Sequence, residues 1–400
     1  MRAKFLLILT FLIIVSFLFA QRKEVEWKGK VEYEDGIKVI KNPKNPLFGK
    51  IKFDLVEDLS IGSEEDENSM FYKGVEIGVD DENNIYVLDF GNCRIQKFDK
   101  EGNYIKTFGR KGQGPGEFEM PIDIYVDKNI YVLEFIKIHI FDKNGKFIRT
   151  IKPDNFVDSC GEMVNESFLA KVTSYRKEGR FSEIAILNSK GKIIKSIVSF
   201  PSPLRSIRKK GIIFGVFNPY EPRLCFCPLK GGKGIYGYSS RYRLFVVNSK
   251  GKIELIFEKA ESPPPISKKD KNKLINNYLK YRNKELKGKD IKLSKGDVKK
   301  AFVFPKYRPF YNEIMCDNLN NIYIRKLNSV LKKKKEITFD FFNSKGFYLY
   351  EIKIPEGPEI IGNGYIYTYI VDETGYFKIK RYKIRNWNKI KKLSTFSLQD

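Results

Sequence analysis

Residues Asp81–Phe118 read DENNIYVLDFGNCRIQKFDKEGNYIKTFGRKGQGPGEF, and this stretch decides the fold. Two runs rich in β-branched and aromatic residues flank a four-residue turn that begins at Asp99 and ends at Gly102. An Asp at the start of a turn accepts hydrogen bonds from the backbone two residues on, and a Gly at its end adopts a positive φ without a Cβ clash. The pattern therefore predicts a tight hairpin that joins two antiparallel strands.

The same turn recurs along the chain. Five turns begin with Asp or Asn and end three residues later in glycine, at Gly102, Gly145, Gly191, Gly251 and Gly346. Successive glycines are 43, 46, 60 and 95 residues apart. The first two spacings match the period of about 40–45 residues that is typical of a four-stranded propeller blade, and the longer ones require insertions.

Short apolar strands, each carrying one aromatic residue, precede most of these turns. Together with the hairpins they complete four-stranded antiparallel meanders, and a weaker sixth unit follows at residues 360–384. An unpaired strand, Gly49–Ser60, precedes the first blade. Because a propeller can close its ring by adding one terminus to the last sheet, we expect Ile51–Val56 to pair beside Phe377–Ile384 as the outer strand of blade six. The predicted fold is all-β, a six-bladed β-propeller of four-stranded antiparallel blades.

Blade one resembles an NHL repeat. It carries the Gly-Asn-x-Arg-Ile-Gln core at residues 91–96, the Phe-Asp-x-x-Gly turn at 98–102 and a glycine-rich exit at 108–118. Blades two to six keep the spacing of strands and turns but little of this consensus. The resemblance implies a six-bladed propeller similar to the exported propellers of bacteria, a group mostly without assigned activity.

The N-terminus resembles an export signal. Arg2 and Lys4 precede the apolar run Phe5–Ala20, and polar residues begin at Gln21. The run has 16 residues, fewer than the roughly 20 that a membrane-spanning helix needs. We expect a periplasmic or extracellular protein, anchored to a membrane only if this segment stays uncleaved. The expected segments are a signal peptide at 1–20, an N-terminal extension at 21–44, the propeller at 45–390 and a tail at 391–400.

A helical insertion is expected at about residues 264–302, between blades four and five. Ser267 and Ser294 each precede an Asp by three residues, in the manner of a capping box. Residues 268–300 contain thirteen Lys or Arg and four Asp or Glu, a net charge of +9. Two interpretations stay open: a solvated helix whose apolar face lies on the propeller rim, or a basic cap over the mouth of the central channel.

The sequence favours a binding protein over an enzyme. His139 is the only histidine, so catalysis by a Ser-His-Asp or Cys-His arrangement would depend on that residue alone. The five cysteines are scattered and suggest no disulfide framework. No set of metal ligands from several blades can be placed, and neither a metal ion nor a cofactor is expected. The alternative is a metal-dependent hydrolase or lyase, since some six-bladed enzymes resemble this architecture.

The charge and the loops suggest the ligand. The chain carries a net charge of +25, which favours acidic partners, and an export signal argues against nucleic acid. Tyr and Arg dominate binding hot spots and occur in the loops expected at one mouth of the channel. We therefore expect an acidic protein or an anionic glycan as ligand. The candidate ligand-binding residues are Arg110, Lys111, Tyr175, Arg176, Tyr238, Arg241 and Tyr242.

Overall fold

The computed structural model describes residues 26–332, 336–355 and 357–398, so the expected signal peptide at 1–20 lies outside it. Blade one contains β5 (Val75–Val79), β6 (Ile85–Asp89), β7 (Arg94–Phe98) and β8 (Tyr104–Phe108). Blade two contains β9 (Pro121–Val126), β10 (Asn129–Glu134), β11 (Ile138–Asp142) and β12 (Phe147–Ile151). Blade three contains β13 (Phe156–Cys160), β14 (Ser167–Arg176), β15 (Gly179–Asn188) and β16 (Ile193–Pro201).

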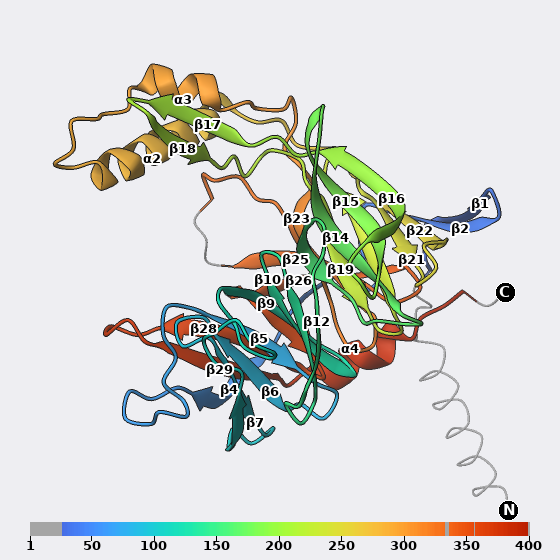
Figure 1. Ribbon diagram of the computed structural model, residues 1–400. Helices are drawn as coiled ribbons and strands as arrows, with labels where there is room; N and C mark the ends of the chain where they lie inside the picture. Colours follow the sequence, from blue (N-terminus) through green and yellow to red (C-terminus); the bar gives the residue numbers. More distant parts are fainter. Residues whose placement is uncertain (1–25, 333–335, 356, 399–400) are drawn as a thin grey trace, which may run out of the picture.

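The second half of the chain repeats this order. Blade four contains β19 (Leu224–Leu229), β20 (Lys233–Tyr238), β21 (Arg243–Val247) and β22 (Ile253–Lys259). Blade five contains β23 (Tyr311–Cys316), β24 (Ile322–Lys326), β25 (Ile337–Phe342) and β26 (Tyr348–Ile354). Blade six contains β27 (Ile360–Gly362), β28 (Tyr365–Val371) and β29 (Phe377–Ile384), and β4 (Leu55–Ile61) supplies its fourth strand. The protein is therefore a six-bladed β-propeller of four-stranded antiparallel blades, as the sequence predicts (Figure 1).

The N-terminal segment closes the ring. Strand β4 pairs antiparallel with β29, and Val56 lies opposite Lys383. The expected strand is split, because β3 (Lys50–Lys52) pairs in parallel with β26 of blade five, where Ile51 lies opposite Ile352. The prediction of closure by the N-terminus is confirmed, with Ile51 in the neighbouring sheet.

The turns have the predicted geometry. At the first of them φ of Gly102 is +88°, and its amide donates to the carbonyl of Asp99 over 3.0 Å. The Asp99 carboxylate accepts hydrogen bonds from the amides of Glu101 and Asn103 at 2.9 and 2.8 Å. The side chain therefore holds the tight bend between the third and fourth strands of blade one, as the sequence predicts.

Both flanking segments pack on the blades. The hairpin of β1 (Lys30–Glu34) and β2 (Ile37–Asn42) extends blade four, because β2 pairs in parallel with β22. At the other end, α4 (Trp387–Ser394) buries Ile390 completely against blade five. No helix of the described residues is long and apolar enough to cross a membrane.

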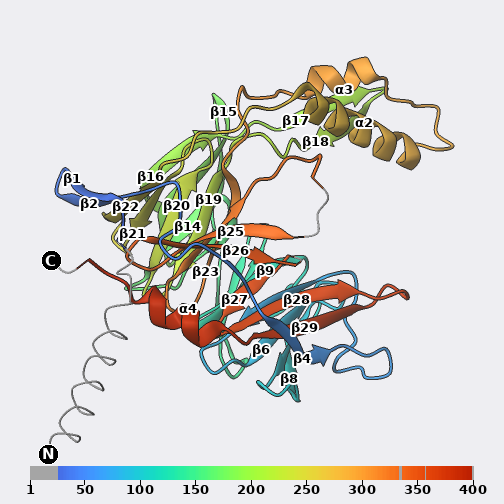
Figure 2. The ribbon, with the colours of Figure 1, turned by 180° about the vertical axis from the view of Figure 1, so that it is seen from behind.

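The helical insertion packs against a second insertion that the sequence did not predict. Helices α2 (Lys268–Glu285) and α3 (Lys295–Ala301) follow blade four, and the hairpin of β17 (Arg205–Lys209) and β18 (Ile212–Val216) follows blade three. Ser267 caps α2, and Ser294 forms the predicted capping box of α3. Figures 1 and 2 show these four elements together, standing away from the blades. We call residues 205–216 and 268–301 the side module.

The side module has a core of its own. Ile207, Phe214 and Val216 of the hairpin pack with Val298 and Phe302 of the helical segment. The apolar face of the helices is therefore covered by the β17–β18 hairpin. This arrangement differs from both interpretations of the insertion, because the apolar face of the helices packs on the hairpin instead of the propeller rim, and the helices do not contribute to the lining of the channel cavity.

Candidate functional site

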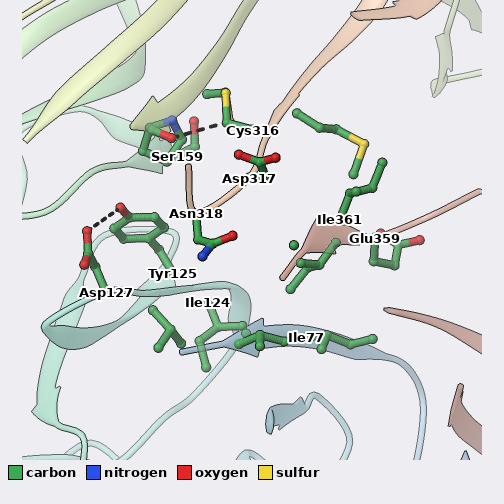
Figure 3. Close-up of a pocket in the computed structure, with 18 of the residues that line it drawn as sticks. Ile77, Ile124, Tyr125, Asp127, Ser159, Cys316, Asp317, Asn318, Glu359 and Ile361 are labelled. Carbon is green, nitrogen blue, oxygen red and sulfur yellow. Dashed lines mark hydrogen bonds between the residues drawn. The ribbon is translucent and has the colours of Figure 1, made fainter. Parts of the chain in front are cut away.

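The central channel contains a cavity with a volume of about 360 Å³. Residues of the innermost strands of all six blades, and of the turns that follow them, line it. Figure 3 shows Ile77 and Ile124 together on one side of it, and Glu359 beside Ile361 on another. At its other side the hydroxyl of Tyr125 donates to Asp127 over 3.1 Å. A cavity of this size is typical of small-ligand sites.

Eight carboxylates from four blades line the channel, and sequence reasoning missed them: Glu76, Asp80, Asp81, Asp123, Asp127, Glu313, Asp317 and Glu359. Burial, together with the smaller effect of the nearby charges of Asp123 and Glu359, raises the pKa of Glu76 to about 8. Burial also raises the pKa of Asp123 to about 6. Glu76 is therefore mostly protonated at neutral pH, because ionisation would place like charges together in a site of low polarity.

Three thiols occupy the wall formed by blades three to five. They belong to Cys160, Cys227 and Cys316, and all three line the cavity. Burial raises the pKa of the Cys160 and Cys316 thiols, which keeps them protonated and poorly nucleophilic. Within the described residues, no group of three or more His, Cys, Asp or Glu side chains is arranged to hold a metal ion.

The raised pKa of Glu76 predicts how the stability of the protein depends on pH. Its pKa is about 8 in the folded protein against an ordinary value of 4.5. Between these pH values the folded state binds more protons than the unfolded state, so the free energy of unfolding falls as the pH rises. We expect Glu76→Gln to remove this slope and to stabilise the protein by about 2 kcal/mol at pH 8, less than the full shift implies because channel water screens the charge.

Urea unfolding between pH 5 and pH 8.5 measures this effect. Glu101→Gln, on an exposed turn, is the matched control and should leave the pH dependence unchanged. Equal pH slopes in the Glu76→Gln variant and the unmodified protein would contradict the assignment.

His139 is buried in blade two, outside the channel. Its Nε2 lies 2.9 Å from the Glu134 carboxylate and its Nδ1 lies 3.1 Å from the Thr150 hydroxyl. The same carboxylate accepts hydrogen bonds from the amides of Glu119 and Met120, and these contacts lower its pKa. The histidine therefore helps to fix the glycine-rich connector onto blade two, which is a structural role.

The candidate residues of the first connector are exposed. The guanidinium of Arg110 lies 2.7 Å from the carboxylate of Glu117, and Lys111 bridges to Phe118 through its backbone. Glu117 also accepts a hydrogen bond from the amide of Gly114 over 2.8 Å. The Glu117 carboxylate thus holds the connector in shape through its contacts with Arg110 and Gly114. The connector is a turn between two strands.

Four other candidates lie on the second-to-third strand loops of blades three and four. Tyr175 is exposed at the end of β14, and Arg176 lies 2.7 Å from the buried carboxylate of Glu183. Arg241 is exposed. Tyr238 stacks on Phe200, with ring centroids 4.1 Å apart and an angle of 8° between the planes. Of these four residues, Tyr238 is the one that lines a described cavity, which is the smaller cavity discussed below.

Tyr242 does not lie at the channel mouth. Its ring is buried between blades four and five, and its hydroxyl donates to Asp340 over 2.6 Å. Lys259 also contacts this carboxylate, at 2.7 Å. The expectation that Tyr242 contacts a ligand is therefore not supported, because its ring is sequestered and its hydroxyl already has a partner.

A second, smaller cavity lies between blades three and four, and sequence reasoning missed all of it except Tyr238. Its volume is about 70 Å³. The lining includes Lys171, Arg180 and Arg223, with Asp158 and the Phe200–Tyr238 ring pair. It lies where the chain leaves β16 for the side module and returns to β19. We call it the neck pocket.

Comparisons with known proteins agree on the fold. The family model described as a 6-bladed beta-propeller, DUF5128, matches residues 72–205, which contain blades one to three. No curated protein matches the sequence. The family model and the six sheets agree that the chain is a six-bladed β-propeller.

Solved propellers are similar at low identity. A predicted exported protein from Bacteroides fragilis is 11% identical, covering 87% of this chain and 99% of its own, with a TM-score of 0.45. A member of the DUF4221 family from Bacteroides vulgatus is 13% identical, covering 85% and 99%, with a TM-score of 0.47. Virginiamycin B lyase from Staphylococcus aureus is 12% identical, covering 83% and 99%, with a TM-score of 0.36. These likenesses concern overall shape and carry no argument about activity.

Proposed function

We propose that the protein is an exported propeller of the NHL kind that binds an acidic protein or an anionic glycan through its side module and the adjoining loops. The observation that carries the proposal is the convergence of two basic insertions. The β17–β18 hairpin and the turn within it add Arg205, Arg208, Lys209 and Lys210 to the +9 of residues 268–300, and they add no acidic residue.

The acidic residues of the side module are all engaged within the protein. Asp270 is buried and accepts hydrogen bonds from Tyr220 and Ser329, outside the module. Asp290 and Asp297 pair with Lys210 and Lys209, each over 2.6 Å, and Glu285 pairs with Arg282 over 2.7 Å. Among the residues that the structure describes, the twelve lysines of residues 268–300 form no ion pair with a carboxylate.

This distribution suits recognition of a polyanion. Clustered lysines produce a positive potential that extends over about 8 Å at physiological salt and weakens at higher ionic strength. Exposed Tyr281 and Tyr175 offer aromatic surface on the side module and on blade three. A ligand that spans both would combine attraction by charge with contacts to these rings.

A metal-dependent hydrolase or lyase is the second candidate, and the carboxylates of the channel favour it. It would use Glu76 and Asp123 of the cavity lining, whose pKa values differ. Calcium or manganese binding that disappears in both Glu76→Gln and Asp123→Asn would support this candidate. Binding of polyanions without any such metal binding would favour the first.

The first proposal is tested by charge reversal on the side module. A triple Lys273→Glu, Lys280→Glu, Lys287→Glu variant changes exposed lysines that have no ion-pair partner among the described residues. Its dissociation constants for poly-L-glutamate and for heparin are expected to rise by about tenfold or more at low salt, and the difference should shrink at high salt.

The matched control reverses three exposed lysines that follow the glycines of the repeat turns: Lys146, Lys192 and Lys252. Those turns join third and fourth strands and lie at the opposite face from the crossings into the side module. The control should change the dissociation constants less than threefold. Equal losses in the two triple variants would show that the total charge of the protein acts diffusely, and the proposal would fail.

A further inference from the structure

The neck pocket holds three basic side chains and one acidic side chain. Lys171 is 3.8 Å from Asp158, and the same carboxylate accepts a hydrogen bond from the hydroxyl of Thr173 over 3.0 Å. Arg180 and Arg223 line the same cavity from β15 and from the segment that leads into β19. The charge of the pocket is therefore positive, and Asp158 is the one carboxylate in its lining.

Neither guanidinium has a carboxylate partner among the described residues. Arg180 is half-buried and donates only to neutral oxygens, to the hydroxyl and carbonyl of Ser202 at 2.8 and 3.0 Å and to the hydroxyl of Thr173 at 3.2 Å. Arg223 is also half-buried, and its guanidinium lies 4.8 Å above the ring of Phe217. Charges placed out of bulk water are normally paired, because desolvation costs several kcal/mol per ion.

The pocket has room for a small group. Its volume of about 70 Å³ exceeds the roughly 30 Å³ that one water occupies in the liquid. The stacked rings of Phe200 and Tyr238 form part of its wall. Arg180, Arg223 and Lys171 all line this cavity, and guanidinium and ammonium groups match the oxygens of a carboxylate, phosphate or sulfate group.

We propose that the neck pocket binds one oxyanion group of the acidic partner, so that Arg180, Arg223 and Lys171 neutralise it while the side module binds the rest. This inference rests on the proposed function for its source of oxyanions, and the binding of free anions tests it separately. The pocket fixes the point of contact at the neck of the side module, where Ser202 and Arg223 flank the inserted hairpin.

Isothermal titration calorimetry with sodium acetate, phosphate and sulfate at constant ionic strength tests the pocket. The protein without residues 1–20 is expected to bind at least one of these anions at a single site. Arg223→Gln and Lys171→Gln should each weaken that binding by about tenfold or more, since each removes a charge-assisted contact. Both variants keep the Arg180 contacts to Ser202, and the melting temperature of each checks that the fold is intact.

Arg385→Gln is the matched control, because Arg385 is an exposed arginine that follows β29 of blade six and does not line the neck pocket. It should leave anion binding unchanged. Absence of saturable binding for all three anions would overturn the inference, and so would binding that Arg223→Gln and Lys171→Gln leave intact. If a free anion binds in the neck pocket but poly-L-glutamate and heparin do not bind the protein, the pocket stands and the proposed function fails.

Discussion

Deletion of residues 45–61 is expected to abolish cooperative folding of the whole propeller. These residues contain β4, the fourth strand of blade six, and β3, which extends blade five. Without β4, the edge of β29 loses its ladder of backbone hydrogen bonds and the ring opens beside blade one. The Arg381 guanidinium also loses both of its contacts with Asp58, each 3.1 Å long. Arg381 is buried, so its uncompensated charge adds to the loss.

Circular dichroism and thermal denaturation measure this effect. The matched control is a chain that begins at Glu26, which keeps every strand of the described structure and the Trp27 ring that packs on Phe347. It should melt as the full chain does. A milder variant, Ile61→Ala, removes a buried side chain of β4 and should cost about 2–4 kcal/mol of unfolding free energy. A cooperative transition at an unchanged temperature in the deletion variant would show that β4 does not close the ring.

The sequence predicted the propeller because its decisive signals are local. An Asx residue and a glycine three positions later specify a turn without any distant partner, and the five turns anchor five sheets. The β17–β18 hairpin lacks such a signal: Lys210 and Gly211 form its turn, and its apolar residues find their core in helices that follow more than 50 residues later. The periodicity of a sequence does not show which distant segment a strand packs against, so the sequence did not predict the hairpin.

The candidate site was predicted less well than the fold, for a related reason. Alternation along a strand places residues on one face or the other, but it does not say whether a face meets a neighbouring blade or the channel. Tyr242 was therefore expected at the mouth, whereas its ring is buried between blades four and five. Glu76 and Asp123 lie on innermost strands of different blades, and only the closed ring brings them together. The same holds for Arg180 and Arg223 in the neck pocket.

Lys259→Met is expected to cost about 3–5 kcal/mol of unfolding free energy. Lys259 of blade four is almost fully buried, and its ammonium lies 2.7 Å from the Asp340 carboxylate of blade five. Asp340 is inaccessible to water and also accepts hydrogen bonds from the hydroxyls of Tyr242 and Tyr348, at 2.6 and 2.5 Å. Lys326 lies 3.8 Å from Asp340, beyond hydrogen-bond range, so it compensates the lost cation only in part. The variant leaves a buried carboxylate without its close counter-ion at the junction of two blades.

A double-mutant cycle separates the ion pair from the packing of the two side chains. Asp340→Asn keeps the shape of the carboxylate and removes its charge, so the double variant Lys259→Met, Asp340→Asn should recover at least about 1 kcal/mol relative to Lys259→Met alone. Urea unfolding of the four proteins gives the coupling energy. Lys50→Met is the matched control, since that lysine is itself exposed in its ion pair with Glu351 and should change stability by less than about 1 kcal/mol. If Lys259→Met costs no more than this control, the buried pair does not hold blade four to blade five, and the apolar contacts of their shared core do so instead.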